Sequence, residues 1–182
     1  MAFCHLTRYY SNTMQYDKAL EFICQAEQLN GKSFIVLRLK GIILQCLSQF
    51  DESKLVFQKA LERNPQSSPT IMYFADLYQN MHNHKQRKEL LDLAYKQSPR
   101  NMQVLKKLAL FYIENDQCES ALSYIRQMEL INPNTPETVL SKLEFYLKLK
   151  QTHKLKEILE IQKGILDKCI LQFYKGCFEQ IS

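Results

Sequence analysis

The stretch "FDESKLVFQKALERNP" (residues 50–65) has the apolar spacing of an amphipathic helix and ends in a proline. An earlier stretch, "YDKALEFICQAEQLNG" (residues 16–31), carries an aromatic residue, an aspartate and an alanine at the same places. Proline lacks the N–H that a further helical turn requires, so the pattern predicts a helix that stops before Pro65. The two stretches lie 34 residues apart, an interval typical of stacked helical repeats.

The same interval aligns other residues along the chain. Pro65 is followed by Pro99 and then by Pro133. Four further columns are Ala26, Ala60, Ala94 and Met128; Gly41, Ala75, Ala109 and Leu143; Leu44, Tyr78, Tyr112 and Tyr146; and Leu37, Ile71, Leu105 and Val139. Because several columns keep one register over most of the chain, the sequence indicates a repeat rather than a chance similarity.

Each unit is predicted to contain two helices. In the first helix, apolar residues recur at i, i+4 and i+7, as in Leu37, Gly41 and Leu44. In the second helix, an apolar stripe is closed by the proline. The column of Gly41, Ala75 and Ala109 is small, which allows two helix backbones to approach closely. A larger side chain in this column would overpack the crossing.

Four polar residues stand where the first helices are expected to begin. Ser68 and Thr135 each precede a proline, which is favoured in the first turn of a helix. Ser33 and Asn101 occupy the corresponding places in two other units. We expect these side chains to cap the helices by accepting hydrogen bonds from free backbone N–H groups.

These columns resemble the tetratricopeptide repeat (TPR) family, whose motif is a 34-residue helix–turn–helix with small, aromatic, alanine and proline positions. The resemblance covers about residues 1–163 and implies an all-α fold, an α-solenoid in which antiparallel helix pairs form a right-handed superhelix. The predicted units are approximately residues 1–33, 34–67, 68–101, 102–135 and 136–164 of a single array over 1–182.

The two ends of the array depart from the family pattern. The first unit has Gly31 in place of its proline, and the fifth has Leu143 and Gln162 in columns of small residues. Residues 165–182 carry a further amphipathic pattern, which is either a C-terminal capping helix or a truncated sixth unit. A complete small protein and a fragment of a longer array are both open.

The composition is that of a folded protein in a reducing compartment. Hydrophobic residues make up 46% and charged residues 24% of the chain, and the net charge of +5 fits an acidic partner. The six cysteines are irregularly spaced without a CxxC motif, so we expect reduced thiols and a cytoplasmic location. No apolar run approaches the roughly 20 residues of a membrane span, and we expect no membrane association.

Patterns of catalytic, cofactor-binding and metal-binding sites are missing from the sequence. His82 and His84 are two residues apart, but no third ligand is arranged near them, so we interpret them as a solvated turn. Glycine-rich phosphate loops, GxSxG and HExxH motifs do not occur. We therefore predict a protein that is not an enzyme and that requires neither a cofactor nor a metal.

Two lysine-rich stretches, residues 85–107 and 142–156, raise the question of nucleic acid binding. Phosphate groups could be neutralised by such residues. However, the neighbouring tyrosines fall in core columns instead of on an exposed stacking face. We therefore interpret the lysines as ordinary surface charge and do not expect a nucleic acid partner.

The TPR resemblance implies that the first helices line a concave groove, with the positions between the core columns facing a ligand. The predicted partner-binding residues are Arg8, Asn12, Ile35, Arg38, Leu39, Ile42, Met72, Tyr73, Asp76, Lys106, Lys107 and Leu110. Ile35, Leu39 and Ile42 form an apolar stripe distinct from the core stripe. This stripe is either covered within the protein or is a receptor strip that faces solvent in the free protein.

Some TPR relatives clamp the acidic C-terminus of the heat-shock chaperones Hsp70 and Hsp90 with a lysine and an asparagine four residues apart. At that spacing this chain has Cys4 with Arg8, Arg38 with Ile42 and Lys106 with Leu110, so we do not expect this carboxylate clamp. We predict a non-catalytic scaffold or adaptor that binds a peptide or helix with an apolar face and flanking acidic residues. The alternatives are a secretion or assembly chaperone that holds an apolar client segment and, third, an RNA-binding helical repeat protein.

Overall fold

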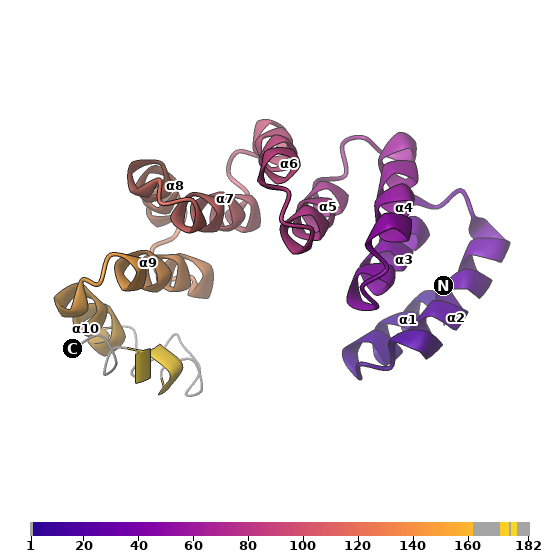
Figure 1. Ribbon diagram of the computed structural model, residues 1–182, viewed down its shortest axis with the longest axis horizontal. Helices are drawn as coiled ribbons and strands as arrows, with labels where there is room; N and C mark the ends of the chain where they lie inside the picture. The colour runs from indigo at the N-terminus through magenta and orange to yellow at the C-terminus, as the bar shows by residue number, and fades with distance from the viewer. Residues whose placement is uncertain (1, 162–171, 175, 178–182) are drawn as a thin grey trace. The chain divides into compact units, whose positions relative to one another are not determined.

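The computed structural model describes residues 2–161, 172–174 and 176–177, and these residues form helices and turns without any strand (Figure 1). The predicted all-α fold is confirmed. The chain divides into two compact units, Met1–Gln97 and Ser98–Ser182. The helices of the first unit are α1 (Ala2–Asn12), α2 (Tyr16–Asn30), α3 (Phe34–Cys46), α4 (Phe50–Arg63), α5 (Ser68–Asn80) and α6 (His84–Gln97). Those of the second are α7 (Met102–Glu114), α8 (Cys118–Ile131), α9 (Pro136–Lys148) and α10 (Thr152–Ile161).

Successive helices pack as pairs within each unit. In the first unit α1 packs on α2, α3 on α4 and α5 on α6, and α2–α3 and α4–α5 contacts join the pairs. In the second unit α7 packs on α8 and α9 on α10, joined by contacts of α9 with α7 and α8. Each pair lies inside one predicted repeat. The expected capping helix or truncated sixth unit, residues 165–182, falls largely outside the described residues. Within that stretch residues 172–174 and 176–177 are described, and they are helical.

The close helix crossing expected at Gly41 is present. A Cβ atom at Gly41 would lie only 2.9 Å from the ring of Phe57 on α4, and Phe57 is itself fully buried. One turn earlier on α4, the buried hydroxyl of Ser53 donates a hydrogen bond to the Gly41 carbonyl at 2.8 Å. Here α4 packs directly on the backbone of α3, so a side chain at Gly41 would push the helices apart.

The apolar stripes that the sequence predicts are buried by the neighbouring helices. In the first unit one cluster contains Ala19, Ile23, Ala26, Val36 and Ile43, and the next contains Phe57, Phe74, Leu77 and Tyr78. In the second unit a cluster contains Val139, Leu143, Leu155, Ile158, Leu159 and Tyr174. Leu143 is fully buried although it replaces a small residue. The two clusters of the first unit each take residues from consecutive helix pairs, so a pair there completes its core against its neighbour. The cluster of the second unit joins α9, α10 and Tyr174.

The turn inside each helix pair repeats one backbone geometry that the sequence did not reveal. Its members are non-glycine residues with φ between 53° and 60°: Met14, Ser48, His82, Asp116 and Lys150, each 34 residues after the last. At Ser48, the N–H of Ser48 donates to the Gln45 carbonyl and the N–H of Gln49 donates to the Leu44 carbonyl. This is the Schellman arrangement, in which a left-handed residue satisfies the last carbonyls of a helix.

The predicted N-caps are confirmed in part. Asn101 accepts two backbone N–H groups of α7. Ser33 occupies the N-cap position of α3, but its side chain makes no capping hydrogen bond. The prediction for Ser68 was wrong, because α5 begins at Ser68 and the N-cap is Ser67. The Ser67 hydroxyl is buried and forms a hydrogen bond of 2.8 Å with the Thr70 hydroxyl, which fixes the turn one residue earlier.

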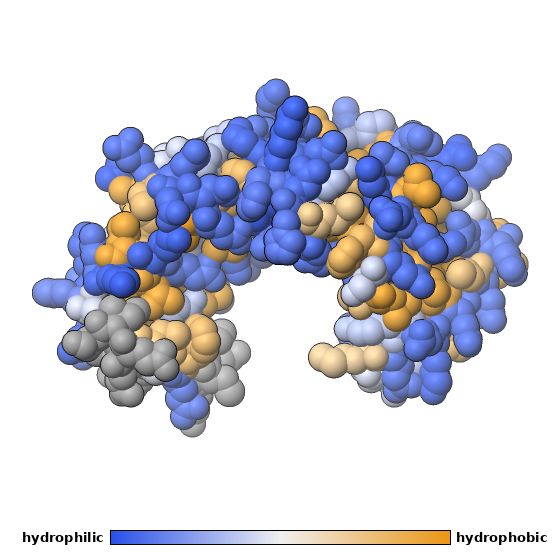
Figure 2. All heavy atoms as spheres, viewed as in Figure 1, coloured by the Kyte–Doolittle hydropathy of each residue, from blue (hydrophilic) through white to orange (hydrophobic). Residues whose placement is uncertain are grey.

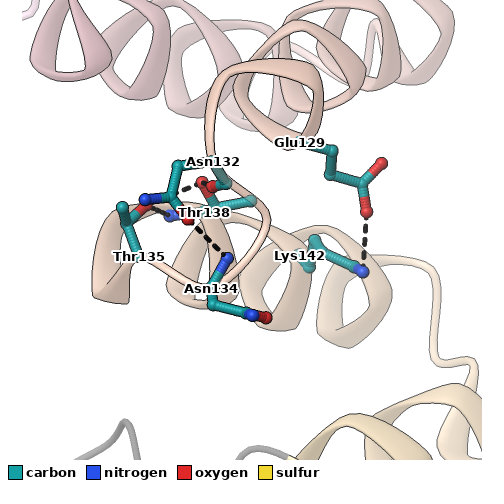
Figure 3. A network of polar contacts seen from close by, with 6 residues as sticks. All are labelled: Glu129, Asn132, Asn134, Thr135, Thr138 and Lys142. Carbon is teal, nitrogen blue, oxygen red and sulfur yellow. Dashed lines mark hydrogen bonds and ion pairs between the residues drawn. The ribbon is translucent and has the colours of Figure 1, made fainter.

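The loop before α9 is held by a polar network (Figure 3). The Thr138 backbone N–H donates to the capping Thr135 hydroxyl at 3.3 Å, and the Thr138 hydroxyl donates to the Asn132 carbonyl at 2.9 Å. Nearby, the Lys142 ammonium lies 2.7 Å from the Glu129 carboxylate and links α9 to α8. These contacts fix the direction in which α9 leaves the loop.

Five cysteines are free thiols, as the spacing predicted: Cys4, Cys24, Cys46, Cys118 and Cys177. Cys169 lies outside the described residues. Within the part of the chain that the structure describes, none of the helices has the length and apolarity that crossing a bilayer requires.

We predict that Gly41→Ala lowers the free energy of unfolding measured by urea denaturation. Overpacking against Phe57 costs about 1–3 kcal/mol, whereas the better helix propensity of alanine returns at most about 1 kcal/mol. The same change in a Phe57→Leu background should cost less, because the smaller side chain leaves room for the methyl group. An equal cost in both backgrounds would show that the crossing is not the source of the effect.

We predict that Ser48→Gly raises the melting temperature. A left-handed conformation costs a non-glycine residue about 1 kcal/mol, and glycine escapes that cost. Gln58→Gly, in the exposed interior of α4, serves as the control and should instead destabilise by about 1 kcal/mol. A lower melting temperature for Ser48→Gly would contradict the assigned turn geometry.

Candidate interaction surface

The first helices of the Met1–Gln97 unit form a hollow of about 350 Å³ at the predicted ligand face. We call it the arginine hollow; it is lined by Thr7, Arg8, Ser11, Asn12, Arg38, Leu39, Ile42, Ile43 and Tyr73. These residues come from α1, α3 and α5, and α3 contacts both of the other two helices. The structure therefore brings together six of the predicted residues, namely Arg8, Asn12, Arg38, Leu39, Ile42 and Tyr73.

The charge of the arginine hollow is not compensated within the part of the chain that the structure describes. Its lining contains Arg8 and Arg38 but no acidic residue. Burial lowers the pKa of the half-buried Arg38 guanidinium, and the like charge of Arg8 lowers it further, while Tyr73 opposes this effect. Because desolvation and repulsion both disfavour the cation, an anion at this place would be favourable to Arg38.

A second, more apolar hollow of about 510 Å³ adjoins the first and shares Arg8 and Leu39 with it. We call it the apolar hollow; it is lined by Phe3, Cys4, His5, Arg8, Ala26, Leu29, Asn30, Ser33, Ile35, Val36 and Leu39. Its volume lies in the range of about 300–1,000 Å³ that is common for ligand pockets. Figure 2 shows apolar atoms gathered over α3 among hydrophilic ones. A bound chain could place apolar side chains here while reaching Arg38 nearby.

The apolar stripe of α3 belongs partly to the surface and partly to the core. Ile35 is 41% exposed, and Tyr73 on α5 has the same exposure. Leu39 is only half-buried and packs against the core cluster of α2 and α3, while Ile42 packs against the cluster of α4 and α5. Leu39 therefore faces solvent only in part, because α3 is surrounded by helices on more than one side.

The remaining predicted residues do not line these hollows. Met72 and Asp76 are half-buried on α5, and Asp76 already has an interaction partner. Lys106, Lys107 and Leu110 lie half-buried on α7, in the Ser98–Ser182 unit. Whether these five residues contact a partner stays a prediction.

The first-helix surface of the second unit carries mixed charge. Burial raises the pKa of the Glu144 carboxyl on α9, and Glu114 raises it further. Lys106 and a hydrogen bond from the Tyr174 hydroxyl oppose that shift. The positive charge of Lys106 is thus directed at an acidic neighbour of its own unit, unlike the charges of the arginine hollow.

Several lining residues were missed from the sequence. Cys4 lies four residues before Arg8 on α1 and Ser11 lies three residues after it, so helical spacing from Arg8 could have indicated both. Thr7 lies at the helical spacing from Cys4 and Ser11 and not from Arg8. Leu29 comes from the end of α2 and is 75% exposed. No local signal pairs Leu29 with Ile35, because the turn between α2 and α3 alone brings them together.

A smaller hollow of about 230 Å³ lies between α9 and α10. Its lysines already have partners, since the Lys154 ammonium lies 4.9 Å from the centre of the Tyr146 ring. Lys142, also in its lining, forms the ion pair with Glu129. This hollow therefore offers a ligand less than the two hollows of the first unit do.

The helix pairs and their 34-residue register match a known protein family. The family model described as Psidin, N-terminal TPR repeats region, matches residues 10–136. The chain belongs to this tetratricopeptide repeat family. No curated protein sequence matches the chain significantly.

Solved TPR structures share the fold at low sequence identity. A TPR protein from Parabacteroides merdae has a TM-score of 0.78 at 12% identity, over 99% of this chain and 72% of that one. TTC0263, a thermophilic TPR protein of Thermus thermophilus, has a TM-score of 0.79 at 16% identity, over 95% of both chains. YrrB, a TPR protein described as having an unusual peptide-binding site, has a TM-score of 0.63 at 15% identity, over 97% of this chain and 91% of that one.

These similarities fix the general class of the molecule. The chain is a TPR repeat scaffold, a fold that serves protein–protein interaction and is generally non-catalytic. Within the described residues, no group of three or more His, Cys, Asp or Glu side chains could hold a metal ion.

We predict that Leu39→Asp destabilises the protein by about 1–3 kcal/mol, because it places a charge against the α2–α3 core. Leu55 on α4 is 57% exposed and is the matched control. Leu55→Asp should change the stability by about 0.5 kcal/mol or less. Chemical denaturation of both variants measures the difference, and equal stabilities would show that Leu39 makes no core contact.

Proposed function

We propose that this TPR protein is a cytoplasmic scaffold or adaptor that binds a partner peptide or helix on the first-helix surface of the Met1–Gln97 unit. The observation that carries the proposal is the pair of adjoining hollows that share Arg8 and Leu39. One hollow supplies apolar walls and the other supplies positive charge without an acidic neighbour. Together they suit a partner segment with an apolar face and acidic residues beside it.

Further observations support this proposal. Ile35 and Tyr73 are large and partly exposed, and such side chains often serve as anchors at interfaces. The free cysteines are consistent with a reducing cytoplasm. YrrB offers a precedent for a peptide-binding site on a related fold.

A chaperone that holds an apolar client segment is the second candidate, favoured by the size and apolar lining of the apolar hollow. It differs from an adaptor in that it should suppress aggregation of a client. RNA binding receives less support, because lysines of the basic stretches are paired with acids. Lys88 lies 2.7 Å from Asp92, and Lys148 lies 2.8 Å from Asp116.

Selection from a displayed library of random peptides would test the proposal. Fluorescence anisotropy would then measure the affinity of the selected peptides for the wild type and for Tyr73→Ala and Ile35→Ala. We predict that each substitution weakens binding by about 1–4 kcal/mol, because both side chains act as anchors.

Leu93 on α6, the second helix of its pair, provides the matched control. It is 40% exposed, while Ile35 and Tyr73 are each 41% exposed. Leu93→Ala should leave the affinity unchanged. Selected peptides that bind Tyr73→Ala and Ile35→Ala as tightly as the wild type would place the binding site elsewhere. Failure to select any peptide would contradict the proposed function.

A further inference from the structure

We propose that the ligand of this surface is a peptide with an internal aspartate or glutamate whose carboxylate binds Arg8 and Arg38, and whose flanking apolar side chains enter the adjoining hollows. This inference rests on the proposed function, and it specifies the chemistry of the partner. The proposed site differs from the lysine–asparagine clamp in two ways. Its charged groups are arginines, and the carboxylate belongs to a side chain within the peptide instead of to its C-terminus.

The two hollows are complementary in charge to an acidic ligand. The two hollows together contain Arg8, Arg38 and His5, but none of their lining residues is acidic. Neither arginine forms an ion pair with another described residue, whereas lysines elsewhere in the same unit do. Lys40 lies 2.6 Å from Glu27, and Lys88 pairs with Asp92. Arginine is well suited to bind a carboxylate through two parallel hydrogen bonds.

The arginines lie part-way along the surface that a bound segment would cover. On α3, Ile35 lines the apolar hollow, Arg38 and Ile42 line the arginine hollow, and Leu39 lines both. Ile35 and Ile42 lie about 10 Å apart along the helix, given its rise per residue. An extended peptide covers this length with about three residues. A segment that uses both hollows therefore continues past Arg38, so the carboxylate belongs to a side chain and not to a chain terminus.

The apolar surroundings argue for a carboxylate over a phosphate. Arg38 is half-buried beside Leu39 and Ile42, which line the same hollow. A phosphate carries close to two negative charges, and removing it from water costs more than removing a singly charged carboxylate. Asn12 and Tyr73 supply neutral polar groups at the same hollow, which can hydrogen-bond the peptide backbone.

Peptides selected with the wild-type protein, acetylated and amidated at their ends, provide the probes. Each selected acidic peptide is compared with a version in which its internal glutamate or aspartate is replaced by the amide. We expect the acid to bind the wild type about tenfold more tightly or better, as a charged hydrogen-bonded pair predicts. In Arg38→Gln and in Arg8→Gln the preference for the acid should fall, and in the double variant the acid and the amide should bind alike, while apolar anchoring persists. Arg63→Gln, an exposed arginine on α4, should keep the preference for the acid.

The outcomes separate this inference from the proposed function. If peptides bind and depend on Tyr73, but acid and amide bind the wild type equally, the carboxylate assignment is overturned and the proposed function stands. A requirement for a free C-terminus, or for phosphoserine in place of glutamate, would also overturn the assignment of an internal carboxylate. Binding that ignores Tyr73→Ala and Ile35→Ala would overturn both. Tight binding of a single-stranded RNA oligonucleotide that competes with the peptides would replace the peptide ligand by RNA.

Discussion

The contact between the α3 backbone at Gly41 and the ring of Phe57 is the constraint on which the helix pair depends. Without a side chain at Gly41, α4 packs directly on α3, and Ser53 satisfies a hydrogen bond to the Gly41 carbonyl in the same place. Alanine fills the equivalent position in the next two repeats, where it is buried. Close pairing of the helices leaves their outer apolar residues to be covered by the following pair. The stacking of pairs within each unit follows from that requirement.

The turns supply hydrogen-bond donors to the backbone carbonyl groups at the end of the first helix of each pair. A helix that ends against its partner leaves carbonyl groups without hydrogen-bond donors. The left-handed residue of each turn directs its own N–H and that of the following residue toward those carbonyls. None of these residues is glycine, so each turn carries a conformational cost that the packed pair offsets. The interval of 34 residues between them gives the repeat a backbone signature beside its sequence signature.

The interaction surface consists of residues of the first helices that the second helices do not cover. Because the second helices cover one side of the first helices, polar and charged residues of α1, α3 and α5 remain together on the other side. Arg8 and Arg38 are close enough to influence each other, and no acidic side chain separates them. The related fold in the Ser98–Ser182 unit shows the contrast, since Glu144 there faces Lys106. One fold can thus present a surface that favours an anion in one unit and a compensated surface in another.

The sequence by itself determined the helix pairs, the small-residue crossing and the core columns, because each follows from local spacing at 3.6 residues per turn and from the 34-residue interval. It also placed Arg8, Arg38 and Tyr73 on first-helix faces. Only the tertiary structure decided that these three line one hollow, that Leu39 is half-buried, and that Leu29 joins Ile35 across a turn. Burial and charge pairing depend on neighbours that are distant in sequence, and periodicity along a single helix does not contain that information.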